Sequence, residues 1–273
     1  MPKPLAFMRA YPLTAKAAVH TPLVFRAGIE SFQNFPWPSL EGIRDFAHFA
    51  GIGDGAVRTA LSRAKAEASL LIEADSSGRN RYILAPATFA MGMAQIHSDR
   101  RREGFLLAIF SFTKDENEDR SALRGVLKAY GFKKLAQNTY IHGRVETESL
   151  RAAIAALGLE EHLFLFTCPE IEDAVLVTRI LALFDIEGRR KVLRAYLTRL
   201  KSFFSGRLTE DELARRLLYV GAVHWELIEA SEPPFPAKYL PDDYALAEIH
   251  RLYGQKLAEG GKALLSYYEK TNQ

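Results

Sequence analysis

The sequence predicts an α+β protein with an N-terminal winged helix-turn-helix, a middle ferredoxin-like domain and a C-terminal α-helical domain. The first observation is a helical pattern at 54–68 that is followed at once by a cationic hairpin pattern at 70–84. The second is the order strand, helix, two strands, helix, strand across 104–168. The third is the helical spacing of apolar residues through 171–273.

The chain before residue 54 is expected to hold two helices. Prolines interrupt residues 1–13, which are therefore expected to be extended. A first helix is expected to begin near Thr14 or Thr21. The segment PWP at 36–38 breaks the chain, and Ser39 is the expected N-cap of a second helix. The apolar stripe of that helix consists of Leu40, Ile43, Phe46, Ala47 and Phe49.

The third helix, 54–68, is expected to turn a small polar face outward. Steps of 100° per residue place four apolar residues on one side: Val57, Leu61, Ala64 and Ala68. They place three small residues opposite, which are Thr59, Ser62 and Ala66, and cations along the margins, which are Arg58, Arg63 and Lys65. Small residues allow close approach to another surface, and arginines suit phosphates and guanine edges. Gly53 is the expected N-cap, and Asp54 complements the helix dipole.

The hairpin at 70–84 is expected to form a wing. Two short apolar strands, LLI at 70–72 and YIL at 82–84, enclose the turn sequence DSSG and then Arg79-Asn80-Arg81. In this arrangement the preceding helix would enter the major groove, and Arg79 or Arg81 would reach the DNA backbone or the minor groove. An ordinary solvated helix followed by a surface turn remains the alternative.

This region resembles the DNA-binding segment of a known family. The run AVRTALSR, within GAVRTALSRAKAE, and the following GRNRYIL are similar to the PaaX-type transcriptional repressors, which control phenylacetate degradation. That family usually carries Gly-Trp between helix and wing, where this chain has Ala68-Ser69. The resemblance implies that the chain binds double-stranded operator DNA. The candidate DNA-binding residues are Arg58, Thr59, Ser62, Arg63, Lys65, Arg79, Asn80 and Arg81.

A linking helix is expected over 87–102. It ends in Arg100-Arg101-Arg102, which is either a phosphate clamp beside the wing or a solvated helix end. The predicted division of the chain has four parts. These are a winged domain with its N-terminal arm at 1–90, a linker helix at 91–103, a ferredoxin-like domain at 104–169 and a helical domain at 170–273.

The middle domain continues the resemblance. Its strands are expected at 105–110, 131–135, 138–142 and 163–167, and its helices at 117–130 and 146–157. The runs FLLAIFSF and GFKKLAQNTYIHGR look like the middle domain of the PaaX-type family, which is related in fold to small nucleases of CRISPR adaptation. Those nucleases present an aspartate to a metal at the end of the first strand. Ser111-Phe112-Thr113 stands there in this chain, which favours a dimerisation and spacing element.

An enzyme acting on nucleic acid or acyl-CoA through the middle domain is the alternative function. Its best carboxylates are Asp115, Glu116 and Glu118, in a polar segment without a nearby pair of histidines. The sequence lacks a Gly-rich phosphate loop and a dinucleotide fingerprint. The histidines lack the paired spacing of metal ligands. We therefore expect neither an enzyme, nor a cofactor, nor a metal site.

The C-terminal part is expected to sense a ligand. Thr209 and Glu212 have the spacing of a capping box before a helix. The run PPFPAKYLPDDYALAEIHRLYGQKL is similar to the C-terminal segment of the PaaX-type family, so the resemblance extends over about 20–258. Five candidate effector-binding residues combine cationic and aromatic side chains: Arg215, Arg216, His224, Trp225 and Arg251. The resemblance implies an acyl-CoA effector, with phenylacetyl-CoA as the family's inducer. A helical core with surface cations is the alternative.

Composition agrees with a cytoplasmic regulator. The 273 residues carry a formal net charge of +3, which permits a nucleic-acid partner without requiring one. Cys168 is the only cysteine, which excludes an intramolecular disulfide. No apolar run approaches the ~20 residues of a membrane span, and no signal peptide is expected. The leading hypothesis is a homodimeric repressor that an acyl-CoA releases from its operator.

Overall fold

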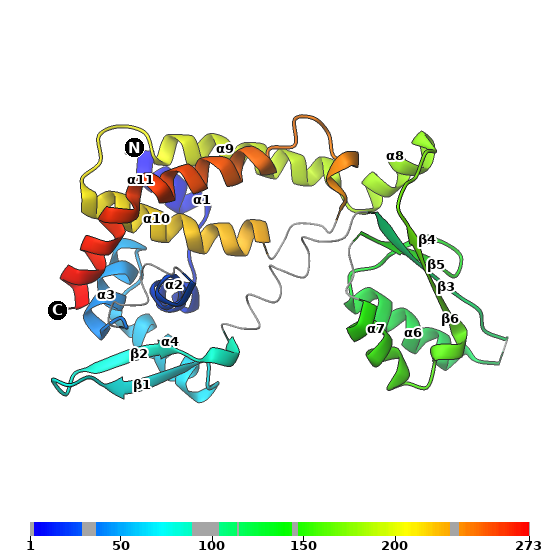
Figure 1. Ribbon diagram of the computed structural model, residues 1–273, viewed down its shortest axis with the longest axis horizontal. Helices are drawn as coiled ribbons and strands as arrows, with labels where there is room; N and C mark the ends of the chain where they lie inside the picture. Colours follow the sequence, from blue (N-terminus) through cyan, green and yellow to red (C-terminus); the bar gives the residue numbers. More distant parts are fainter. Residues whose placement is uncertain are drawn as a thin grey trace. The chain divides into compact units, whose positions relative to one another are not determined.

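The computed structural model describes residues 3–28, 37–88, 104–113, 115–143, 147–229 and 235–272. The described residues form the α+β architecture that the sequence predicts, with N-terminal helices, a middle sheet and C-terminal helices (Figure 1). Contacts divide the chain into two compact units. The first consists of Met1–Met93, Leu193–Ser231 and Ala245–Gln273, and the second of Ala94–Val192 and Glu232–Tyr244.

The N-terminal arm is helical, so the expectation of an extended segment is wrong. Helix α1 spans Lys3–Ala10. The Phe7 side chain is 1% exposed and stacks on Phe203, with ring centroids 4.4 Å apart. Just after the helix, the Tyr219 hydroxyl donates to the Tyr11 carbonyl over 2.8 Å. The apolar face of α1 is therefore buried against distant helices, which outweighs the weak local preference of its sequence.

The helix-turn-helix consists of α2 (Ala15–Gly28), α3 (Leu40–Phe49) and α4 (Asp54–Ala66). Helix α2 begins after Thr14, whose hydroxyl accepts the Ala17 N–H over 3.1 Å. Ser39 caps α3 as expected, because its hydroxyl accepts the Gly42 N–H over 3.2 Å. Gly53 is the N-cap of α4 and offers no side chain for capping.

Helix α4 starts in a fixed position relative to α3. The Asp54 carboxylate, in the first turn of α4, lies 3.3 Å from Arg44 Nε and 3.2 Å from His48 Nε2. Both partners belong to α3. These exposed contacts add little free energy individually, but together they set the angle of the turn between the two helices.

The wing is a two-stranded antiparallel hairpin, β1 (Leu70–Ala74) and β2 (Asn80–Leu84). Its register pairs Leu70 with Leu84 at one end and Ala74 with Asn80 at the other. The Asp75 carboxylate accepts the N–H groups of Ser77 and Arg79 over 2.9 and 3.0 Å, which closes the turn. Gly78 has φ of 80°, a conformation that glycine adopts without a steric cost.

Ala68 is not part of the apolar side of α4, contrary to the prediction. The helix ends at Ala66, and Ala68 is exposed with φ of 52°. The chain turns there so that Ser69 can donate its hydroxyl to the Ala64 carbonyl over 3.0 Å. The short connection to the wing therefore forces one non-glycine residue into the left-handed region.

The second unit contains the predicted ferredoxin-like order: β3 (Phe105–Phe110), α6 (Asn117–Ala129), β4 (Lys133–Ala136), β5 (Thr139–His142), α7 (Thr147–Ala155) and β6 (Leu163–Cys168). The antiparallel sheet has the order β4-β5-β3-β6, and Figure 1 shows α6 and α7 together beside it. One face of the sheet packs its core side chains against these helices. The opposite face carries exposed apolar residues: Ile109, Phe164 and Phe166.

The C-terminal helices are α8 (Ala174–Leu183), α9 (Ile186–Phe203), α10 (Glu210–His224) and α11 (Leu246–Asn272). The capping box of α10 is present, with Glu212 N–H 3.2 Å from the Thr209 hydroxyl and the Glu212 carboxylate 3.0 Å from Thr209 N–H. A π-helical turn continues α10 over Trp225–Glu229. None of the described helices is both long and apolar enough to cross a membrane.

The structure groups these helices differently from the predicted domain at 170–273. Helices α10 and α11 pack against α2 and α3 within the first unit, whereas α8 packs against β4 in the second. The division between the units falls inside α9, between Val192 and Leu193. The predicted linker at 91–103, with its three arginines, lies outside the described residues.

Candidate nucleic-acid interface

Helix α4 divides into a buried side and an open side. Val57, Leu61 and Ala64 are at most 8% exposed and form the side that packs against the rest of the winged domain. Three small residues on the opposite side are exposed: Thr59, Ser62 and Ala66. The predicted orientation of α4 is therefore confirmed for all of these positions. A helix with small outward side chains can approach a surface with its backbone.

Three cations border the open side of α4. Arg58 and Lys65 lie along one margin and Arg63 along the other, as the helical steps require. All three side chains are exposed. None of the three makes a hydrogen bond or ion pair through its side chain with any described residue. Their charges are therefore available to an anionic partner.

The wing presents two of its three predicted residues. The Arg79 side chain is 56% exposed, although its Nε donates to the Ser77 hydroxyl over 2.9 Å. Asn80 is exposed at the start of β2. Both side chains therefore lie where a wing could contact DNA.

Arg81 is buried, whereas the sequence predicts that its side chain contacts DNA. It is 7% exposed, and its Nε and Nη2 each lie 2.9 Å from the Asp75 carboxylate. Its backbone bridges to Ser39, and the next residue, Tyr82, donates its N–H to the Pro38 carbonyl over 3.0 Å. The segment before α3 thus covers this part of β2. Arg81 holds the turn end of the wing through Asp75 and is left out of the proposed interface.

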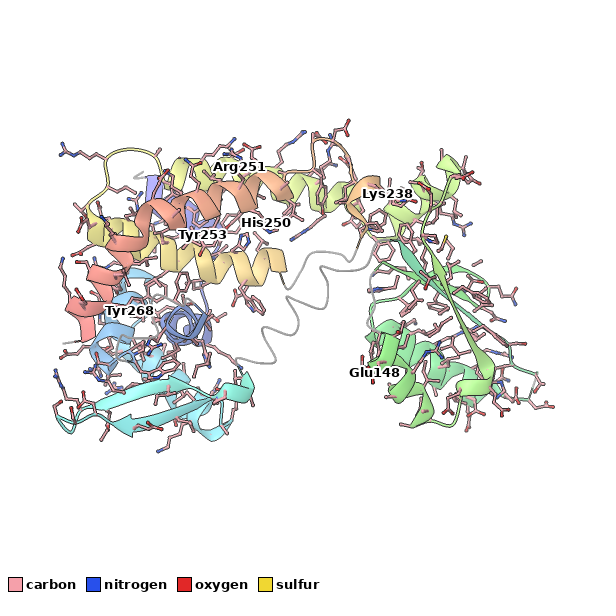
Figure 2. All side chains as sticks on the ribbon, viewed as in Figure 1. Glu148, Lys238, His250, Arg251, Tyr253 and Tyr268 are labelled. Carbon is pink, nitrogen blue, oxygen red and sulfur yellow. The ribbon has the colours of Figure 1, made fainter. Side chains whose placement is uncertain are left out.

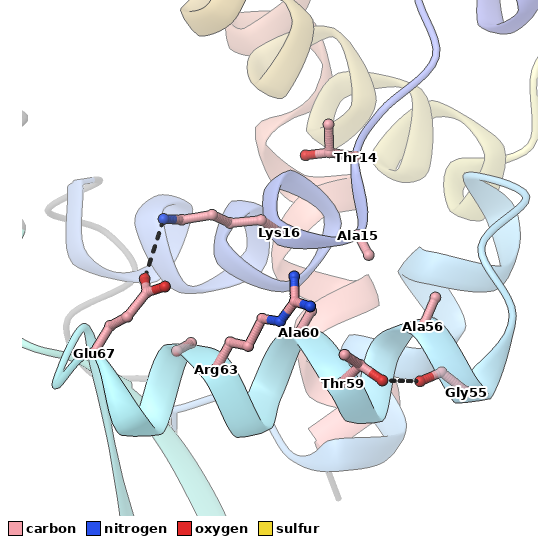
Figure 3. Close-up of a pocket in the computed structure, with 10 residues that line it drawn as sticks. Thr14, Ala15, Lys16, Gly55, Ala56, Thr59, Ala60, Arg63 and Glu67 are labelled. Atoms are coloured by element: carbon pink, nitrogen blue, oxygen red, sulfur yellow. Dashed lines mark hydrogen bonds and ion pairs between the residues drawn. The ribbon is translucent and has the colours of Figure 1, made fainter.

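A hollow of about 450 Å³ lies beside α4, where the start of α2 faces it (Figure 3). Its lining residues come from these two helices and their ends: Thr14, Ala15, Lys16, Gly55, Ala56, Thr59, Ala60, Arg63, Ala64 and Glu67. Across it, Lys16 Nζ lies 3.3 Å from the Glu67 carboxylate. Sequence reasoning missed Lys16 and Glu67, because only the packing of α2 on α4 brings them together.

The five predicted effector residues do not gather around one space. Arg215 binds both Asp45 oxygens, over 3.0 and 2.9 Å. Arg216 is 6% exposed and donates to the Phe203 carbonyl, and its burial lowers the pKa of the guanidinium. The buried His224 ring stacks on Tyr253, with centroids 5.1 Å apart. These three side chains stabilise the helical packing.

The side chains of the remaining two predicted effector residues are more exposed to solvent. Trp225 is half-buried in the π-helical turn. Arg251 is exposed on α11, and its position is labelled in Figure 2. The hollow beside α4 contains none of the five predicted residues. The effector assignments therefore rest on Trp225 and Arg251.

The carboxylates of the alternative enzymatic function serve the loop that holds them. The Glu116 carboxylate accepts the Thr113 N–H over 2.7 Å, and this bond holds the pKa of the carboxyl below its ordinary value. Arg120 donates to the Thr113 carbonyl over 2.8 Å. Asp115 and Glu118 are exposed beside it, at the start of α6. In the described part of the chain, no group of three or more His, Cys, Asp or Glu side chains could hold a metal ion.

The three helices α2, α3 and α4, followed by the wing, have the arrangement of a winged helix-turn-helix. Residues 102–175 match the family model described as the PaaX protein central Cas2-like domain. This match confirms the resemblance to the PaaX-type regulators, and it covers the ferredoxin-like part of the chain.

One similar solved structure covers nearly the whole chain. It is the uncharacterized protein Rv0674 from Mycobacterium tuberculosis, with 18% sequence identity and a TM-score of 0.59. The alignment covers 95% of this chain and 99% of that protein, so the order of the domains is shared. No curated protein matches the sequence significantly.

Proposed function

We propose that this chain is a homodimeric transcriptional repressor that binds operator DNA through α4 and the wing. The observation that carries this proposal is the open side of α4, where small residues lie between unpaired cations. The coarser function, a transcriptional regulator, follows from the PaaX-type match. Repression and the identity of the effector are more specific than this function, and both rest on the resemblance to the PaaX-type family.

The dimensions of α4 support a place in the major groove. A helix with its side chains is about 10–12 Å across, and the major groove of B-DNA is about 12 Å wide. Thr59 and Ser62 would then face the base edges, and Arg58 could reach a guanine with two hydrogen bonds. Lys65 and the wing residues Arg79 and Asn80 would meet phosphates or the minor groove.

Two copies would read two half-sites about 34–36 Å apart, one turn of DNA. We propose the ferredoxin-like domain as the part that joins and spaces the copies. An acyl-CoA, with phenylacetyl-CoA as the first candidate, would release the operator only if it binds the DNA-incompetent arrangement more tightly.

The test is fluorescence anisotropy with the full chain on its own upstream DNA and on scrambled DNA. We expect Arg58→Ala to weaken operator binding by about 1–3 kcal/mol and to relax base choice at one position. The matched control is Arg207→Ala, an exposed arginine between α9 and α10, which should bind as the wild type does. If Arg58→Ala bound the operator with the affinity and selectivity of the wild type, the proposal that α4 reads the DNA bases would be contradicted.

The effector is tested by the same anisotropy experiment, and the dimer by sedimentation. Phenylacetyl-CoA should release the operator at concentrations where free coenzyme A does not. Binding that neither compound changes would remove the acyl-CoA proposal and leave the DNA-binding role intact. Sedimentation equilibrium should give twice the 30.6 kDa mass of one chain.

A further inference from the structure

The hollow between α2 and α4 has a cationic lining that the proposed base-reading residues do not explain. Two of its lining side chains are cations, Lys16 and Arg63, and Glu67 is the one carboxylate. Figure 3 shows the Arg63 guanidinium directed from α4 into the space below the start of α2. No described residue forms a hydrogen bond or ion pair with this guanidinium, so its charge is not compensated within the described part of the chain.

The Lys16 ammonium group can exchange the Glu67 carboxylate for another anion at a small cost in free energy. Its side chain is 69% exposed and that of Glu67 is 55% exposed. Exposed ion pairs contribute only about 0–1 kcal/mol, so a stronger anion can displace Glu67 from the ammonium group. Lys16 and Arg63 would then face the same anion from two helices.

Most side chains that line the hollow are small, which leaves room for the backbone of a nucleic-acid strand to enter. Five lining residues are glycine or alanine: Ala15, Gly55, Ala56, Ala60 and Ala64. A Cβ atom placed on Gly55 would meet nothing within 4 Å. The backbone of α4 is thus reachable from this flank, and the long side chains that line the hollow are those of Lys16, Arg63 and Glu67.

With α4 in the major groove, the groove's two sugar-phosphate strands must run along the two flanks of the helix. One flank carries Arg58 and Lys65, and the other carries the hollow. We propose that the hollow seats a phosphate of the second strand, bound by Lys16 and Arg63, with Glu67 holding Lys16 when DNA is absent. This inference rests on the proposed function.

The proposal separates two arginines that the sequence placed together. Arg58 would read a base, whereas Arg63 would position the protein through a phosphate. A phosphate contact carries no direct sequence information, so its loss weakens binding to every DNA equally. It also removes one counterion-release contribution, which changes the dependence of binding on salt.

The decisive variants are Lys16→Gln and Arg63→Gln in the full chain, with Lys262→Gln on α11 as the matched exposed lysine. Each of the first two should weaken binding to operator and scrambled DNA by the same factor, on the order of tenfold near 0.1 M salt. The slope of log K against log salt should become shallower by about 0.9. Lys262→Gln should change neither quantity, and the ratio of operator to scrambled affinity should stay constant throughout.

Glu67→Gln tests the same contact from the opposite direction. Removing the carboxylate frees Lys16 and removes repulsion of the phosphate, so binding to both DNAs should tighten severalfold. Glu269→Gln, an exposed carboxylate on α11, is the control. A single methylphosphonate in the operator should weaken wild-type binding at one position, and the weakening there should be smaller in Lys16→Gln, which keeps only Arg63 at the phosphate.

Several results would overturn the inference. Unchanged affinity and salt slope in Lys16→Gln, with selectivity still lost in Arg58→Ala, would reject the phosphate seat and keep the proposed function. A drop in the operator-to-scrambled ratio in Arg63→Gln would make Arg63 a base reader instead. If inorganic phosphate displaces DNA more strongly than chloride at equal ionic strength, and Lys16→Gln abolishes that excess, the hollow holds a free anion.

The two proposals fail in distinguishable ways. Equal wild-type affinity for operator and scrambled DNA would refute the proposed function, while the salt slope of Lys16→Gln on scrambled DNA would still test the seat. Absence of binding to either DNA would refute both.

Discussion

Ala68 holds the chain between α4 and the wing in a backbone conformation that costs free energy. Its φ of 52° lies in the left-handed region, where a Cβ atom crowds the following carbonyl. The PaaX-type resemblance places a glycine at this position. Since Ala68 is exposed, no packing contact compensates for the strain.

Ala68→Gly is therefore expected to stabilise the protein by about 0.5–1 kcal/mol, because the relief of strain exceeds the entropy that glycine adds to the unfolded chain. Urea unfolding followed by circular dichroism measures the shift in midpoint. The matched control is Ala66→Gly, the last residue of α4, which should destabilise by about 1 kcal/mol. An equal loss in both variants would contradict the strain at Ala68.

Arg81 shows why residue type alone does not assign a contact. Arg79 and Arg81 look alike in the sequence, yet one is 56% exposed at the side chain and the other 9%. The two side chains differ in exposure because the segment before α3 lies against β2, where the Ser39 backbone pairs with the Arg81 backbone. Such a non-local backbone contact leaves no pattern in the local sequence.

At the scale of elements, the wing depends on one ionised carboxylate. The Ser77 hydroxyl donates to Asp75 over 2.6 Å, and this bond, with the N–H groups of Arg79 and Ser77 and the Arg81 side chain, holds the pKa of Asp75 well below its ordinary value of 3.8. A lowered folded-state pKa stabilises the fold above the ordinary value. The contribution is lost as the pH falls below 3.8 toward the folded-state value.

We expect Asp75→Asn to lower the melting temperature at pH 6, and the difference from wild type to shrink as the pH falls below about 4. Scanning calorimetry of both proteins across this range measures it. Glu73→Gln, an exposed carboxylate in the same hairpin, should show no such convergence. A constant difference between wild type and Asp75→Asn at every pH would contradict the role of the ionised carboxylate.

At the scale of the whole molecule, the C-terminal helices complete the first unit. Asp45 on α3 accepts two hydrogen bonds from Arg215 on α10 and one from the Tyr267 hydroxyl on α11. Nearby, Ser39 donates to the Thr271 carbonyl over 3.0 Å. The same helix-turn-helix that presents α4 is thus held by residues 170 to 232 positions away in the sequence.

A double-mutant cycle of Asp45→Ala and Arg215→Ala should give a coupling free energy of about 1–2 kcal/mol. The value lies above that of an exposed pair because the contact is bidentate, and solvent still screens it since each side chain is about a third exposed. Chemical unfolding of the four proteins measures it. The control cycle, Lys270→Ala with Asp211→Ala, joins more exposed partners and should give less than about 0.5 kcal/mol.

Local patterns in the chain were enough to predict most of the elements and their exposed faces. Helical periodicity identified the buried side of α4, turn residues identified the wing, and the strand-helix order identified the ferredoxin-like sheet. These features depend on residues close together in the chain, and the match to the PaaX central domain agrees with them. The DNA-binding role of the open side of α4 stays a prediction.

Contacts between distant residues could not be predicted in this way and became visible in the folded chain. Phe7 is buried against distant helices where the sequence predicts an extended arm, and Arg215, Arg216 and His224 make contacts within the helical packing. The packing of α2 on α4 created the hollow with Lys16. The physical reason is common to all of these: contact energies between segments far apart in the chain depend on the folded geometry, which local periodicity does not encode.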